Sequence, residues 1–238
     1  LEKIKLHLFK RFGQQTAPIS MPLVMSTLRS NFALVIQTLS KTKHINKKIN
    51  HLKKQGYQLN INLLGETIQS EKQAQQQRQH YVTLLKQKQV HCISIKVSSL
   101  HSQCNPLAKT FVLRKICSQL DTLFKAAIEA NPNNPKFIYF DMESHDLVDI
   151  TLTAFMKTLG QSQFTTFAAG IALQAYLPSS HSMQKTLTEW AKNRVKKGGA
   201  PIKIRLVKGA NLNMEKIEAE QKGWQPQTYK RKIERSEE

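Results

Sequence analysis

The 238-residue sequence has few cysteines and no long apolar run. Its three cysteines, Cys92, Cys104 and Cys117, stand far apart and form no C-x-x-C pair. Neither a zinc site nor a disulfide framework is therefore indicated, and we expect reduced thiols in a reducing compartment. No charged-then-apolar signal segment is found, and no apolar stretch approaches the ~20 residues that span a bilayer. The sequence predicts a soluble, cytoplasmic protein.

Acidic residues are also scarce, because 16 Asp and Glu face 36 Lys and Arg, for a net charge of +20. The excess is densest in residues 1–58, where eleven basic residues accompany the single acid Glu2. The run KTKHINKKINHLKK (41–54) is rich in lysine and has no interleaved aromatics. It is typical of a helix with a solvated basic face. A nucleic acid or anionic lipid headgroups as partner is the alternative that charge alone leaves open.

A helical leader is predicted over residues 1–57, and strands alternate with helices over residues 58–230. The predicted leader helices are LEKIKLHLFKRF, MPLVMSTLRSNFALVIQTLS and the basic run. The predicted strands are 59–64, 91–97, 136–141, 169–176 and 202–207. The predicted helices cover about 70–88, 107–130, 146–159, a segment carrying Met183, Leu187 and Trp190, and 213–222. Such alternation indicates parallel βα units, and residues 231–238 form a charged tail.

Each predicted strand carries one polar residue at or near its carboxyl end. These residues are Asn62, Lys96, Asp141, Gln174 and Arg205. Their spacing fits successive βαβ steps, and in a (βα)8 barrel such residues meet at one mouth and form a ligand site. At that mouth the Arg205 charge can be met by a ligand or by Asp141. Helix caps, or a structural ion pair of Asp141 with Lys96, are the alternative. No G-x-G-x-x-G follows a strand, which argues against a Rossmann sheet but leaves flavodoxin-like sheets open.

Five ordered motifs carry a resemblance to a known family: NINLLGE, ISIKVSSL, YFDMES, LQAYLP and IRLVKGA. In this order and at these intervals they resemble the proline dehydrogenase domain of bifunctional bacterial proline-catabolism flavoenzymes, over roughly 17–230. The resemblance implies an FAD enzyme on a (βα)8 barrel. It oxidises L-proline to 1-pyrroline-5-carboxylate by hydride transfer to flavin N5, and passes the electrons to quinone at the membrane surface. The expected place is therefore the cytoplasm, peripheral at the inner membrane face.

The resemblance also implies roles for individual residues. Lys96, Asp141 and Arg205 are the expected catalytic residues, with Arg205 beside flavin N5 and Lys96 paired to Asp141. Lys96 and Asn62 are expected at the substrate. The expected FAD contacts are Asp141, Met142, Gln174, Arg205, Val207, Gly209 and Ala210.

The sequence departs from the family pattern in three ways. Asn62 replaces an aspartate found in many relatives, and Asn211 replaces an aromatic. The family also continues past Trp224 into further strands and, in bifunctional members, an NAD-dependent aldehyde dehydrogenase domain. We therefore expect an incomplete barrel of about five strands, inactive without the missing half. A basic nucleic-acid-binding or membrane-surface protein, or a gene remnant, is the alternative function.

Overall fold

The computed structural model describes residues 21, 49–63, 67–141, 143–231 and 234. The chain divides into two units, Leu1–Gln58 and Leu59–Glu238. In the first unit, residues 49–54 are helical and form the end of the predicted basic helix. The other predicted leader helices lie almost wholly outside the described residues, as does the earlier part of the basic run.

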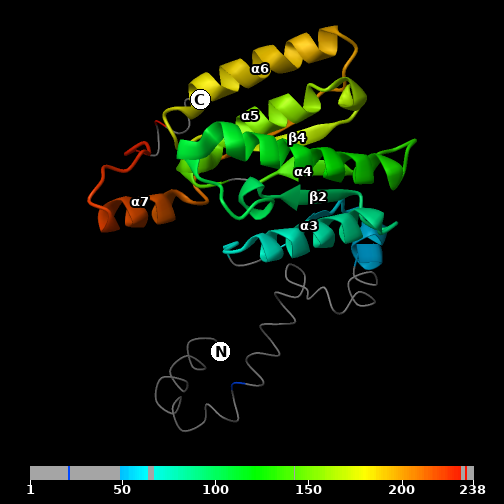
Figure 1. Cartoon of the computed structure of the whole chain (residues 1–238), viewed down its shortest axis with the longest axis horizontal. Coiled ribbons are helices and arrows are strands. Elements are labelled where there is room, and N and C mark those ends of the chain that lie inside the picture. The colour runs from blue at the N-terminus through cyan, green and yellow to red at the C-terminus, as the bar shows by residue number, and fades with distance from the viewer. Residues whose placement is uncertain (1–20, 22–48, 64–66, 142, 232–233, 235–238) are drawn as a thin grey trace. The chain divides into compact units, whose positions relative to one another are not determined.

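The second unit is built on a sheet of five parallel strands in the order β1-β2-β3-β4-β5 (Figure 1). The strands are β1 Asn60–Asn62, β2 Cys92–Ile95, β3 Phe137–Phe140, β4 Ala169–Gln174 and β5 Lys203–Val207. Each strand pairs with the next one along the chain, as right-handed βαβ crossovers produce. All five predicted strands are confirmed, each within its predicted range.

Helices follow the strands close to the predicted positions. They are α3 Glu71–Lys86, α4 Lys109–Glu129, α5 Val148–Leu159, α6 Ser180–Lys196 and α7 Leu212–Gln221. Helix α3 begins with a capping box, in which Ser70 accepts the Gln73 N–H and the Gln73 side chain accepts the Ser70 N–H. Short 3-10 turns follow β2 and β3, at η2 Val97–Ser99 and η4 His145–Leu147.

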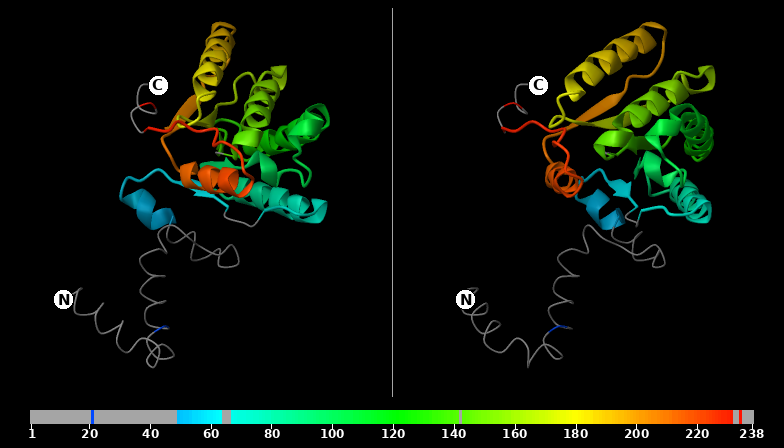
Figure 2. Two further views of the ribbon diagram at one scale, coloured as in Figure 1. Left: turned by 90° about the vertical axis from the view of Figure 1, so that its left-hand side faces the viewer. Right: turned by 60° about the vertical axis from the view of Figure 1, so that its left-hand side comes forward.

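One face of the sheet is apolar and is covered by α3 to α6, whereas α7 lies apart from these four helices (Figure 2). Isoleucines and phenylalanines of the strands point to the covered face and are almost fully buried; they are Ile93, Ile95, Ile138, Phe140 and Ile171. Phe124 of α4 packs edge-on against Phe164, with ring centroids 5.2 Å apart. Each such buried side chain stabilises the fold by about 1.5–3 kcal/mol.

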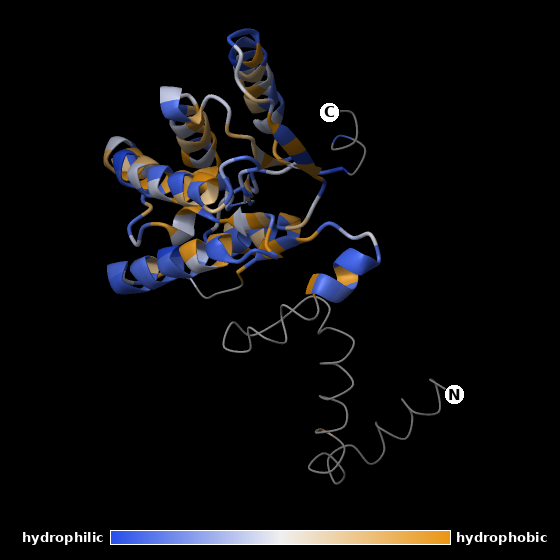
Figure 3. Ribbon diagram, turned by 90° about the vertical axis from the view of Figure 1, so that its right-hand side faces the viewer, coloured by the Kyte–Doolittle hydropathy of each residue, from blue (hydrophilic) through white to orange (hydrophobic). Residues whose placement is uncertain are grey.

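The opposite face carries the alternate, polar residues of the strands, and we call it the polar face. It includes Asn60, Asn62, Cys92, Ser94, Phe137, Tyr139, Lys203 and Arg205 of β1, β2, β3 and β5, and Gly170 of β4 lies in register between Tyr139 and Lys203. Blue and orange alternate along β5 in Figure 3 because its hydropathy alternates. Within the described residues β5 pairs only with β4, and its Ile204 and Leu206 are 37% and 45% exposed.

Candidate active site

Three alternate strands place side chains against one another on the polar face. Asp141 directly follows β3, and its carboxylate is bonded on both oxygens. Oδ1 lies 2.5 Å from the Arg205 guanidinium of β5, and Oδ2 accepts the Asn62 amide of β1 at 2.9 Å. In (βα)8 barrels, layers of inward side chains come from alternate strands, and this cluster has that arrangement. The structure thus brings together Asn62, Asp141 and Arg205.

The Arg205 guanidinium is exposed on the polar face rather than enclosed. Its side chain is 45% exposed, while that of Asp141 is 15% exposed. The Arg205 guanidinium lies over the Tyr139 ring at 5.8 Å, and the Lys203 ammonium lies over the Phe137 ring at 5.1 Å. These cation–π contacts and the ion pair hold two cations side by side on the open surface.

The Tyr139 ring packs against β4 at Gly170, where there is no side chain to displace it. A Cβ atom at Gly170 would lie 2.3 Å from Cε1 of the Tyr139 ring, so any larger residue displaces the ring. Tyr139 was not among the residues predicted from the sequence. Its position in β3, two residues before Asp141, is the signal that could have found it, because residues i and i+2 of an extended segment share a face.

Lys96 does not have the predicted ion pair with Asp141. Both Asp141 oxygens are occupied by Arg205 and Asn62, and within the described residues no salt bridge joins Lys96 to Asp141. Lys96 precedes η2 with an exposed side chain, and its charge acts instead on the buried Glu143 carboxylate. The pairing prediction was wrong because sequence spacing does not show which strands' side chains converge.

Glu143 follows the carboxyl end of β3 and Gln174 ends β4, and both side chains are buried. The Glu143 carboxylate accepts the Ser98 N–H at 3.0 Å and the Ser98 hydroxyl at 2.9 Å. Burial raises the pKa of the Glu143 carboxyl, and the Ser98 hydrogen bonds and the Lys96 charge oppose that rise. Gln174 donates its side-chain amide to the Glu143 carbonyl at 2.6 Å and to the Tyr176 hydroxyl at 3.1 Å. The Gln174 amide nitrogen is thus bonded within the protein.

The backbone predicted to approach a cofactor follows β5. Gly209 and Ala210 are exposed, and the Val207 carbonyl accepts the Ala175 N–H at 3.0 Å. The Gly209 carbonyl accepts the Leu212 N–H at 3.3 Å, which starts the turn into α7. Met142 lies outside the described residues.

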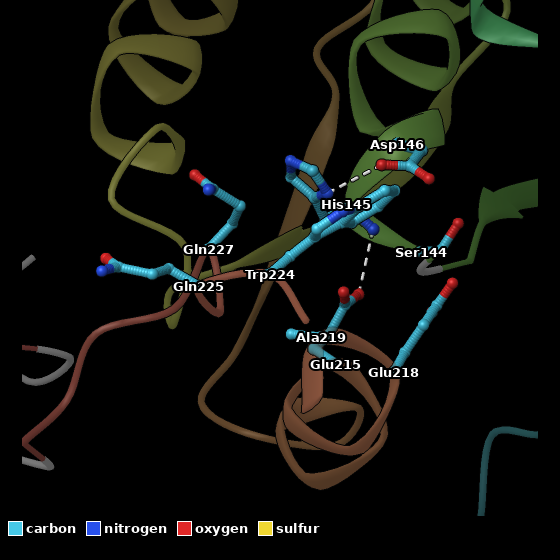
Figure 4. A pocket seen from close by; sticks show the side chains of 9 residues that line it. All are labelled: Ser144, His145, Asp146, Glu215, Glu218, Ala219, Trp224, Gln225 and Gln227. Carbon is cyan, nitrogen blue, oxygen red and sulfur yellow. Dashed lines mark hydrogen bonds and ion pairs between the residues drawn. The ribbon is translucent and has the colours of Figure 1, made fainter. Parts of the chain in front are cut away.

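A cavity of about 410 Å³ lies between η4 and α7, and Figure 4 shows its lining. His145 donates its backbone N–H to Glu215 Oε1 at 2.9 Å, and its ring Nδ1 lies 2.8 Å from Asp146 Oδ1. None of the predicted site residues lines this cavity. In the described ranges, no three or more His, Cys, Asp or Glu side chains are grouped to hold a metal ion. No described helix is long and apolar enough to cross a membrane.

A sequential parallel sheet with a charged cluster at the carboxyl ends of its strands has the architecture of part of a (βα)8 barrel. The family profile for proline dehydrogenase matches residues 45–237, and the chain therefore belongs to the proline dehydrogenase family.

Solved structures agree with this assignment. Proline utilization A from Corynebacterium freiburgense is 35% identical with a TM-score of 0.81, over 95% of this chain and 23% of that chain. Proline utilization A from Bdellovibrio bacteriovorus, inactivated by N-propargylglycine, is 28% identical with a TM-score of 0.70, over 80% of this chain and 22% of that chain. This chain thus spans less than a quarter of these relatives. A comparison with curated proteins gives no match.

Proposed function

We propose that the polar face binds FAD and that the site formed there oxidises L-proline to 1-pyrroline-5-carboxylate. The observation that carries the proposal is the cluster of Asn62, Asp141 and Arg205 at the carboxyl ends of the strands in a chain of the proline dehydrogenase family. FAD, when bound, accepts the hydride from proline at N5 of its ring.

The donor set of the polar face fits FAD. Arg205 bonds Asp141 through Nη2, and a guanidinium has five N–H donors, so donors remain for a ligand on the open surface. Lys203 supplies a second cation on the same strand. FAD carries two phosphates and an electron-accepting ring, and fixed cations stabilise both kinds of group. The exposed backbone at Gly209 and Ala210 permits close approach.

In this proposal the residues position and polarise. Asp141 holds Arg205 in one orientation through a charged hydrogen bond, so the cation needs no rearrangement when negative charge develops beside it. Lys96 and Asn62 border the substrate, and Gln174 borders the flavin edge. Asn62 is neutral, so proline's amine meets amide dipoles there rather than a second carboxylate.

The electrons are proposed to pass to a membrane quinone, with the chain bound peripherally at the inner membrane face. The net charge of +20 supports this, since anionic lipid attracts basic surfaces. Turnover is proposed to require further strands paired to β5, because its second edge is unpaired within the described sheet. An NAD-dependent aldehyde dehydrogenase domain would belong to such a longer protein.

FAD titration with fluorescence detection tests the cofactor proposal. Arg205→Met is expected to weaken FAD binding at least about tenfold, since a charged hydrogen bond contributes about 1.5–3 kcal/mol. Arg114→Met, on the exposed side of α4, is the matched control and should leave the affinity unchanged. Equal affinity of wild-type chain and Arg205→Met would refute a flavin site on the polar face. Anaerobic bleaching of bound FAD by L-proline, with the remaining barrel strands supplied, tests the reaction.

A further inference from the structure

Glu143 is a buried carboxylate that joins the ends of two neighbouring strands. It lies two residues after Asp141 and is 6% exposed. Its side chain accepts both the backbone N–H and the hydroxyl of Ser98, in the η2 turn that follows β2. The turn begins at Lys96, whose carbonyl accepts the Ser99 N–H at 3.0 Å and the Ser99 hydroxyl at 2.6 Å. Glu143 therefore fixes the turn that carries Lys96.

The backbone of Glu143 fixes a third strand end. Its carbonyl accepts the Gln174 amide at 2.6 Å, at the end of β4. Gln174 is 2% exposed, so this hydrogen bond has little competition from water. The segment 141–143 thus contacts β1 and β5 through Asp141, η2 through the Glu143 side chain, and β4 through its carbonyl.

A charged residue at this buried position costs stability that an apolar residue of the same size would not cost. A buried carboxylate loses hydration and is tolerated only where hydrogen bonds and opposite charge replace it. Ser98 supplies the hydrogen bonds and Lys96 the positive charge. The Tyr81 hydroxyl is hydrogen-bonded to the Ser99 hydroxyl of the same turn. An apolar residue would fill the space but could not hold the turn.

We infer that Glu143 is a positioning residue of the active site, which sets Lys96 and Gln174 relative to Asp141. The inference rests on the proposed function for the roles of Lys96 and Gln174. Glu143 itself touches neither substrate nor cofactor in this account. It acts through the η2 turn and through Gln174.

The test compares Glu143→Ala and Glu143→Gln with Glu71→Ala in the full chain. Glu71 is the matched control, because its carboxylate also holds the segment after β2, through His101 at 2.9 Å and Ser102 at 3.2 Å, without contacting η2. The first readouts are amide exchange at residues 98–100 and acetylation of Lys96 by an activated ester, both followed by mass spectrometry. The second readout is the FAD dissociation constant.

Glu143→Ala is expected to speed exchange at residues 98–100 about tenfold, the loss of one buried hydrogen bond. It should also change Lys96 acetylation and weaken FAD binding about tenfold. Glu143→Gln keeps an acceptor for the Ser98 N–H and should restore most of the protection. Glu71→Ala should leave exchange at residues 98 and 99, Lys96 acetylation and the FAD affinity unchanged, although it lowers stability. Exchange at residue 100 is left out of this comparison, because Arg78 joins Glu71 to the Leu100 carbonyl.

Two results would overturn the inference. One is unchanged exchange and unchanged Lys96 acetylation in Glu143→Ala. The other is an equal loss of FAD affinity in Glu143→Ala and Glu71→Ala, which indicates general destabilisation. If the wild-type chain binds no FAD, the proposed function fails in this chain, and exchange with acetylation still decides whether Glu143 positions Lys96.

Discussion

Arg194 offers the sharpest test of how the strands are held in place. This arginine of α6 is 9% exposed, and within the described part of the chain its guanidinium donates to backbone carbonyls. The acceptors are Ala200 from Nε at 3.0 Å, Leu159 from Nη1, and, from Nη2, Phe164 at 2.7 Å, Thr165 at 2.8 Å and Phe167 at 3.0 Å. They belong to the segments that enter β4 and β5, at the end of the sheet opposite the cluster of Asn62, Asp141 and Arg205. Burial lowers the pKa of Arg194, but the guanidinium stays charged.

Arg194→Met keeps the length of the side chain and removes every donor. The Phe164 and Thr165 carbonyls still accept the Phe167 and Ala200 N–H groups, at 3.0 and 2.8 Å. The other three carbonyls lose a charged donor, and each buried acceptor left unpaired costs about 1–3 kcal/mol. Relief of the buried charge offsets part of this loss. The free energy of unfolding should therefore fall by about 3–5 kcal/mol.

Urea unfolding followed by circular dichroism measures this loss directly. Arg194→Lys should fall between wild type and Arg194→Met, because an ammonium has three donors and lacks the planar fork. Arg114→Met on exposed α4 is the control and should change stability by no more than about 0.5 kcal/mol. A loss below about 1 kcal/mol in Arg194→Met would refute the reasoning, since it would mean that water replaces the guanidinium without cost.

Three further predictions follow from single contacts. Gly170→Ala should displace the Tyr139 ring and lower the free energy of unfolding by about 1–3 kcal/mol. The double variant Gly170→Ala/Tyr139→Ala should recover part of that loss. Additive losses in the double variant would contradict the contact. Burial acts to raise the pKa of Glu71, but hydrogen bonds from Arg78, Ser102 and His101 lower it to about 2, so its stabilisation is present above pH 4.5 and lost as the pH falls toward 2. Stability measured against pH should therefore be flatter between these values in Glu71→Gln, and an unchanged slope would contradict the assignment. Burial raises the pKa of the Cys92 and Cys104 thiols to about 11, so iodoacetamide at pH 8 should alkylate both far more slowly than a free thiol, and rapid alkylation would exclude this packing.

The alternation of predicted strands and helices along the sequence indicates the fold, and the structure confirms these elements close to their predicted ranges. Apolar residues at every second position identify the covered face of each strand, as at Ile93 and Ile95. The polar residue at each strand end indicates the edge where the candidate site lies. These signals are local, so one sequence suffices to recognise them.

The contacts between strands could not be predicted in the same way. The sequence offers Asp141 two cations, Lys96 and Arg205, and spacing alone does not decide between them; Asp141 pairs with Arg205, 64 residues away. Glu143 and Arg194 look like ordinary surface charges in the sequence. Their importance depends on burial against Ser98 and against backbone carbonyls from other segments.

Backbone NMR of the isotope-labelled chain titrated with FAD tests the central claim most directly. We expect the shifted amides to cluster at the polar face, around residues 62, 141, 170 and 205–210, and Arg205→Met to move this titration to FAD concentrations at least about tenfold higher. Shifts confined to the outer helices α3 to α6, or to the basic run at 41–54, would contradict a flavin site at the strand ends.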